Sequence, residues 1–443
     1  MSHISKLSKE DPKSFWQEIN KLQNLENGSK EDTGEQISTD EWLDHFKSIN
    51  SNITLNKREQ EYADNIVTSL ELQTDNPLDF DITTEEIRQG LCNLKCNKSC
   101  GVDSISNEML KYSASQLSLP LKKMFNILLQ SGTFPQQWSQ SMLVPIHKSG
   151  ETTNPTNYRG IAISSCVGKL FTFILNKRLQ NYLESENLLS PFQSGFRKNF
   201  RTSDNVFVLK TLIVQQISKP AGKLYACFVD FRKAFDSVWR NGLFYKLLSS
   251  GIGGNFFKII KSMYSNVRYC VKTPNGLSPY FQSSCGVRQG CNLSPLLFNL
   301  YLNDLPNILN SRASDPLILQ DTPINSLFWA DDLVLLSKSE SGLKECLRTL
   351  DQFCSIWKLS INEKKTKVMI FTKNGRTNSQ HSTYKIQGRT IDITTSYTYL
   401  GVDLTPSGSF DRATKQLRLK ALRASFKLKS LLSTNFNPSI RLS

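Results

Sequence analysis

The chain has 443 residues, 39% of them apolar, and its 54 Lys and Arg against 39 Asp and Glu give a net charge of +15. This length exceeds one ordinary domain and predicts two or three subdomains. The charge indicates an anionic partner, either nucleic acid or an acidic membrane surface, but a generally basic protein has the same composition. The sequence has no apolar run of membrane-spanning length and a polar start, so we expect an intracellular protein without membrane contact.

The first helices are predicted from caps and apolar spacing. Residues 1–80 are polar and interrupted, which indicates a linker or arm with short amphipathic helices near 14–23 and 38–49, the second capped by Ser38 or Thr39. Residues 82–95 predict a helix capped by Thr83 or Thr84. Residues 117–135 predict another, ended by Gly132 and Pro135.

Cysteines recur every four residues at Cys92, Cys96 and Cys100. This spacing places them on one helix face, but a fourth zinc ligand is not found nearby, so ordinary thiols are favoured over a zinc site. The ten cysteines follow no disulfide framework, which suits a reducing compartment.

Strands are predicted from short apolar runs in the second part of the chain. Residues 141–148 and 224–231 predict strands, the latter buried. Residues 292–305 predict a helix capped by Ser294, and 340–359 another. Residues 365–373 and 397–404 add strands. The irregular mixture of helices and strands indicates the α+β class.

Two adjacent aspartates, Asp331 and Asp332, interrupt the apolar stretch SLFWADDLVLL at 326–336. The pattern predicts a β-hairpin, but a two-residue turn favours Asn-Gly or Asp-Gly over Asp-Asp. Neighbouring carboxylates also raise each other's pKa unless a cation neutralises them. A plain turn and a site for a divalent metal both remain open from this stretch alone.

A third carboxylate, Asp230, ends the buried strand in CFVDFRKAFDSVW. It could cap a turn or pair with Arg232 or Lys233. Together with the aspartates of the hairpin it also forms the minimal set for two metal ions, which can activate a hydroxyl and stabilise a leaving pyrophosphate. On a basic protein this favours phosphoryl transfer on nucleic acid.

Six ordered blocks carry a family resemblance from about residue 85 to 405: PIHKSGETTNPTNYRGIAISS, LLSPFQSGFRKNFRTSDN, FVDFRKAFD, GVRQGCNLSPLLFNLYLNDL, FWADDLVLL and KLSINEKKTKVMIF with YTYLGVDL. The sequence resembles the reverse transcriptase domain of non-LTR (LINE-like) retrotransposons, of the jockey kind. The resemblance implies an α+β right-hand polymerase. Its parts would be an N-terminal linker at 1–80, fingers at 81–222, a palm at 223–404 and the start of a thumb at 405–443.

The resemblance also implies the residues of a polymerase site. Asp230, Asp331 and Asp332 would be catalytic and, with the peptide oxygen of Phe231, would bind two Mg²⁺, for which Mn²⁺ could substitute. The other residues implied are Lys148 and Arg159 at the phosphates of the nucleotide, Phe235 at its sugar, Gln289 and Gly290 at the nascent base pair, and Lys365 as the general acid. Lys364 and Lys367 are close enough in sequence to leave the last assignment open.

The function implied is RNA-directed DNA polymerisation from a primer 3′-hydroxyl, with an RNA template, a DNA primer or target and dNTPs as partners. The nucleus and cytoplasm are implied as its location. A non-catalytic nucleic-acid-binding remnant and a protein like a group II intron maturase are the alternatives. Trp329 stands where the family usually has Tyr or Phe, Gly160 where Pro is common, and KNFRTS departs from Gly-Arg-Ser-Thr. A fragment of a larger polyprotein is expected, with a degenerate genomic copy as the alternative.

Overall fold

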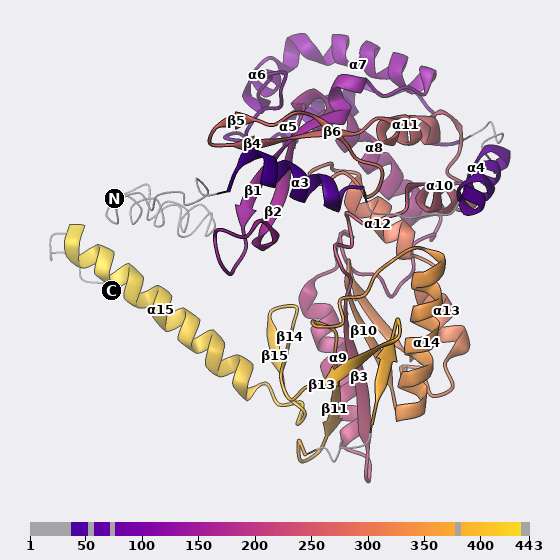
Figure 1. Ribbon diagram of the computed structural model, residues 1–443, viewed down its shortest axis with the longest axis vertical. Helices are drawn as coiled ribbons and strands as arrows, with labels where there is room; N and C mark the ends of the chain where they lie inside the picture. Colours follow the sequence, from indigo (N-terminus) through magenta and orange to yellow (C-terminus); the bar gives the residue numbers. More distant parts are fainter. Residues whose placement is uncertain (1–36, 52–56, 71–75, 377–381, 436–443) are drawn as a thin grey trace.

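The computed structural model describes residues 37–51, 57–70, 76–376 and 382–435. Two sheets, each with its own helices, stand above one another in Figure 1, and helices and strands mix as an α+β protein requires. In the described parts of the chain, the helices are too short or too polar to cross a membrane. The helix predicted near residues 14–23 lies outside the described residues.

The first sheet has the order β2–β1–β4–β5, with β6 also paired to β4. β1 pairs antiparallel with β2 and parallel with β4, a strand that follows it by more than 100 residues. The strands are β1 (Gln140–His147), β2 (Tyr158–Ser164), β4 (Arg268–Thr273), β5 (Gly276–Leu277) and β6 (Phe281–Gln282). The helices beside this sheet are α3 (Thr39–Ile49), α4 (Lys57–Leu70), α5 (Thr84–Asn93), α6 (Asn107–Tyr112), α7 (Ala114–Ser131), α8 (Cys166–Ser185), α10 (Arg240–Ser249) and α11 (Gly254–Ser265).

The second sheet has the order β12–β13–β11–β3–β10–β9, with β3 near its centre. Because side chains alternate along a strand, Leu224, Ala226 and Phe228 of β3 join one core, whereas Cys227 and Val229 join the other. The strands are β3 (Lys223–Asp230), β9 (Ser326–Trp329), β10 (Asp332–Ser337), β11 (Lys367–Thr372), β12 (Tyr384–Ile386) and β13 (Arg389–Ile393). Helix α9 (Thr202–Ile217) covers the first of these cores and α14 (Glu340–Ile356) the second.

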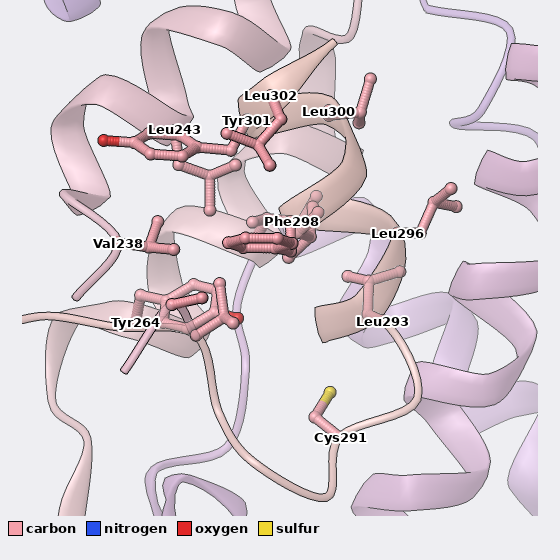
Figure 2. Packing of buried hydrophobic residues seen from close by; sticks show 14 of the residues in the cluster. Val238, Leu243, Tyr264, Cys291, Leu293, Leu296, Phe298, Leu300, Tyr301 and Leu302 are labelled. Carbon is pink, nitrogen blue, oxygen red and sulfur yellow. The ribbon is translucent and has the colours of Figure 1, made fainter. Parts of the chain in front are cut away.

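Helix α12 (Ser294–Leu302) lies between the two parts and is buried on all sides. Figure 2 shows Phe298 directed towards Val238 and Tyr264, with Leu243 beside them. Apolar side chains lie around most of its circumference, and a helix of this kind is stable only when it is buried. The two parts therefore share one core at the level of α12.

Most helix boundaries predicted from caps are confirmed. Ser38 and Thr83 each form a capping box with a glutamate three residues later, and Gly132 ends α7 in the left-handed conformation. Ser294 was wrongly predicted as an N-cap: it is the first helical residue, and its hydroxyl donates to the Arg288 carbonyl at 2.7 Å.

The predicted arm at 1–80 is wrong for residues 37–50. Trp42 and Phe46 of α3 are buried in the main core, because the amphipathic helix places both on one face.

The predicted helix at 82–95 ends at Asn93, so Cys96 and Cys100 lie beyond it and do not share a helix face with Cys92.

The chain passes between the two sheets more than once. Strands β4–β6 belong to the first sheet although they follow β3, and α9 covers the second sheet although it precedes β3. A single division near residue 222 therefore does not separate the two sheets.

The remaining α-helices and strands are α13 (Leu305–Arg312), β7 (Leu317–Leu319), β8 (Thr322–Ile324), β14 (Tyr397–Tyr399), β15 (Val402–Leu404) and α15 (Asp411–Asn435). Helix α15 extends away from the body in Figure 1.

Candidate active site

The three aspartates meet at one end of the second sheet. Asp230 is the last residue of β3, and Asp332, the first of β10, is its direct antiparallel partner, so both side chains belong to the same face. The hairpin turn consists of Ala330 and Asp331, not of Asp331 and Asp332 as the sequence suggested. Ala330 takes the positive φ of +57° that such a turn needs, which frees Asp332 to continue the strand.

The carboxylates influence one another electrostatically. Desolvation raises the pKa of Asp332 to about 6, and the charges of Asp331 and Asp230 add to this rise. Desolvation also raises the pKa of Asp331, with a contribution from Asp230, whereas Arg159 and Lys148 oppose the rise. The three acids therefore form one cluster, and the side chains of Lys148 and Arg159, both predicted from the sequence, are close enough to influence its pKa values.

A cleft of about 410 Å³ lies against this cluster. Its lining includes seven of the predicted residues besides Phe231: Asp230, Asp331, Lys148, Arg159, Phe235, Gln289 and Lys365. Asp332 and Gly290 are not part of this lining. We call the part formed by Asp230, at the end of β3, and Asp331, in the β9–β10 turn, the acidic wall, and the part formed by Lys148 and Arg159 of the β1–β2 hairpin the basic wall.

The structure distinguishes among the three lysines near position 365. Lys365 lines the cleft. Lys367 instead forms an ion pair with Asp392 at 2.6 Å on the sheet, and Lys364 is not part of the lining. Lys365 is therefore the one of the three placed to reach a ligand in the cleft.

Phe235 has two environments. Its ring stacks on buried Phe298 with centroids 4.6 Å apart and meets Phe196 edge to face at 6.3 Å, yet it remains half-buried and lines the cleft. A core role and a contact with a ligand can therefore coexist in this side chain.

Asp236, which the sequence analysis missed, holds Gln289 in place. The Gln289 amide donates a short hydrogen bond to the Asp236 carboxylate, and both residues line the cleft. Burial raises the pKa of Asp236, while the bond from Gln289 and the charges of Lys233 and Arg159 oppose that rise. The sequence shows Asp236 six residues after Asp230, but it does not reveal that Gln289 is the hydrogen-bond partner of Asp236.

Gly290 allows the backbone of its loop to approach strand β2 closely. Its φ is +85°, and a β-carbon there would lie 2.7 Å from the carbonyl oxygen of Ala162 on β2. The glycine therefore lets the loop before α12 lie against the first sheet.

Helix α3 contributes part of the cleft that the sequence did not reveal. Phe46, Ile49 and Asn50 are among the lining residues. A β-carbon at Gly160 would lie 2.7 Å from the Phe46 ring, so the glycine found where the family commonly has proline makes room for α3. Amphipathic spacing predicted the helix, but nothing in the sequence indicated that it packs beside the cleft.

A larger groove of about 1210 Å³ adjoins the cleft, and Tyr158 lines both. Gly290 lines the groove beside an apolar floor that includes Val144, Ile161 and Ile163. Four lysines also line it: Lys95, Lys98, Lys169 and Lys272. A basic groove with an apolar floor suits an unpaired nucleic-acid strand.

Within the described residues, no three His, Cys, Asp or Glu side chains lie close enough together to hold a metal ion as they stand. The donor set at the cleft still fits a hard divalent cation, because its oxygens are carboxylates. Burial raises the pKa values of Asp331 and Asp332, and the charges of the neighbouring carboxylates add to the rise, which a bound cation would oppose. Asp230, Asp331 and Asp332 are the residues that would hold such a cation.

Comparison with known proteins identifies the family of this chain. Residues 146–404 match the family described as reverse transcriptase (RNA-dependent DNA polymerase), and the chain belongs to that family. The match contains both walls of the cleft, from Lys148 to Lys365.

The relatives are polymerases of non-LTR retrotransposons. The chain is 29% identical to a probable RNA-directed DNA polymerase from transposon BS of Drosophila melanogaster, over 86% of this chain and 42% of the relative. It is 28% identical to the RNA-directed DNA polymerase from mobile element jockey of the same species, over 75% and 36%. A probable polymerase from transposon X-element is 27% identical over 66% and 32%. The chain thus spans less than half the length of these relatives.

Proposed function

We propose that this chain is the polymerase core of a non-LTR retrotransposon reverse transcriptase, which adds dNTPs to a primer 3′-hydroxyl on an RNA template. The observation that carries the proposal is the cleft that Asp230 and Asp331 line together with Lys148, Arg159 and Lys365. A polymerase site needs cationic side chains at the phosphates of the nucleotide. It also needs carboxylates that can hold divalent cations beside the reacting phosphorus. This cleft offers both kinds of residue.

The acidic wall acts at the reacting end of the primer. Bound divalent cations would supply the Lewis acidity that phosphoryl transfer uses. Asp230, Asp331 and Asp332 would hold these cations, and the β3–β10 pairing fixes Asp230 and Asp332 relative to each other. The Asp230 amide also donates a hydrogen bond to the Thr366 hydroxyl at 3.1 Å, which further fixes the position of Asp230.

The basic wall acts on the triphosphate. Lys148 follows β1, and its amide donates to the Asn157 carbonyl at 2.8 Å across the β1–β2 hairpin that also carries Arg159. The side chains of both residues are exposed, so they can close on a ligand. Lys365 would protonate the leaving pyrophosphate.

The arrangement of the two sheets suits a right-hand polymerase. The first sheet with its helices would be the fingers, the second sheet the palm, and α15 the start of a thumb. The groove lined by Lys95, Lys98, Lys169 and Lys272 adjoins the cleft at Tyr158, where the unpaired template would enter.

The test is primer extension by the purified chain on poly(rA) with oligo(dT), dTTP and Mg²⁺. We expect extension that Asp230→Asn abolishes, since the amide keeps the size of the side chain but loses its charge. Asp321→Asn is the matched control, because Asp321 is exposed in the β7–β8 turn at φ +63°, which asparagine tolerates. A wild-type chain that binds this duplex without extending it would contradict the proposal.

A further inference from the structure

The residue before Asp331 has an unfavourable backbone conformation. Ala330 is buried, with φ +57°, a region that a residue with a β-carbon rarely adopts. If Ala330 relaxed, the following peptide would rotate and the Asp331 carboxylate would leave its place in the cleft. Something in the surrounding structure must therefore hold Ala330.

Gln193 makes two hydrogen bonds to this one residue. Its side-chain oxygen accepts from the Ala330 amide at 3.0 Å, and its side-chain nitrogen donates to the Ala330 carbonyl at 3.2 Å. The same oxygen accepts from the Gly195 amide at 2.9 Å. Gln193 is 2% exposed and does not line the cleft, so it acts on the hairpin and not on a ligand.

The backbone around Gln193 continues the sheet beyond β9. The Phe328 amide donates to the Phe192 carbonyl at 3.2 Å, and the Ser194 amide donates to the Phe328 carbonyl at 3.1 Å. Asn205 of α9 donates to the same Phe328 carbonyl at 2.9 Å. These bonds fix the position of Gln193 relative to the hairpin.

Gly195 brings this segment into direct contact with the turn. A β-carbon at this position would lie 2.2 Å from the Ala330 nitrogen, closer than any side chain could approach. The QSG segment at 193–195, part of a block that the sequence analysis recognised but gave no role, thus lies against the residue that needs support.

We propose that Gln193 is a positioning residue for polymerisation: it holds Ala330 in the left-handed conformation and so keeps Asp331 directed at the cleft. This inference rests on the proposed function. A misplaced carboxylate weakens cation binding and slows chemistry, whereas the binding of dNTP to the basic wall should change little.

The test compares Gln193→Met with Gln216→Met. Both glutamines are buried, but Gln216 of α9 bonds Lys219 and not the hairpin. We expect Gln193→Met to lower kcat for primer extension by about 100-fold with little change in KM for dNTP. The affinity for Mn²⁺, measured from free Mn²⁺ by electron paramagnetic resonance, should fall about 10-fold. Gln216→Met should change neither.

A second substitution separates positioning from general stability. Glycine adopts positive φ readily, so Ala330→Gly should restore much of the kcat and Mn²⁺ affinity lost in Gln193→Met. If Gln193→Met does not fold, Gln193→Glu replaces it, since that side chain keeps an acceptor for the Ala330 amide and loses the donor to its carbonyl.

Unchanged kcat and Mn²⁺ affinity in the Gln193 variant would overturn the inference. So would losses that Ala330→Gly does not reduce. If the wild-type chain does not extend primers, the proposed function fails on its own, and the Mn²⁺ titration still decides whether Gln193 positions the acidic cluster.

Discussion

Asp230 and Asp332 lie on paired interior strands of the six-stranded sheet, whereas Lys148 and Arg159 lie on the exposed end of the β1–β2 hairpin. The backbone pairing of β3 and β10 fixes the acidic wall before any ligand arrives. The basic wall has side chains with room to move. Under the proposed function, the acidic wall would serve chemistry and the basic wall the capture and release of the nucleotide.

The largest effect should come from the acidic wall. Asp331→Asn should lower primer extension by about 1,000-fold, because the amide lacks the charge that would hold the divalent cations at the reacting phosphate. The affinity for a primer–template duplex, measured by fluorescence anisotropy, should remain within about twofold, since the change removes a negative charge. A variant that extends primers normally would show that the acidic wall is not catalytic.

The basic wall should give a smaller effect of another kind. Lys148→Ala combined with Arg159→Ala should raise KM for dNTP by about 10- to 100-fold, as loss of charge-assisted hydrogen bonds to phosphate predicts. Steady-state extension at several dNTP concentrations measures this change. If the double variant instead loses affinity for the template while its KM for dNTP is unchanged, both residues bind the nucleic acid and not the nucleotide.

Phe235 should affect the choice of sugar. Its ring is held by Phe298 and borders the cleft, so it can exclude a 2′-hydroxyl by direct collision. Phe235→Val should improve incorporation of ribonucleotides relative to dNTPs by about 10-fold, measured by competitive extension. Equal loss of both substrates would show that Phe235 only supports the core.

The smallest effect should be on stability at the junction of α3 with β2. Gly160→Ala should lower the free energy of unfolding by about 1–3 kcal/mol, because the new methyl group would collide with the Phe46 ring. Urea denaturation measures the change. In a double-mutant cycle, Phe46→Leu should reduce the penalty of Gly160→Ala. Additive effects would mean that the two positions do not interact.

Local patterns predicted much of the acidic wall. Apolar runs located β3 and β10, and the ordered motifs located Asp230, Asp331 and Asp332. The turn was placed one residue late, because the usual preference for glycine or asparagine concealed Ala330 as the residue with positive φ. That conformation depends on Gln193, which is more than 130 residues away in the chain.

Contacts between distant segments were beyond prediction. The destination of α3 depends on the space that Gly160 leaves, and the parallel pairing of β1 with β4 joins segments with no shared pattern. Arg240 is a further case: its guanidinium donates to the carbonyls of Ser283, Cys285 and Gly286 and so shapes the loop that leads to Gln289. Its sequence neighbours gave no sign of that role.

The most direct test asks whether the two walls enclose one cation-binding cleft. Fe²⁺ in place of Mg²⁺, with ascorbate and peroxide, generates hydroxyl radicals that cut the nearby backbone, and mass spectrometry locates the cuts. We predict cuts near Asp230 and near Asp331, weaker cuts in the hairpin between Lys148 and Arg159, and loss of all three in Asp230→Asn. Cuts at only one of these segments, or cuts that persist in Asp230→Asn, would contradict the account.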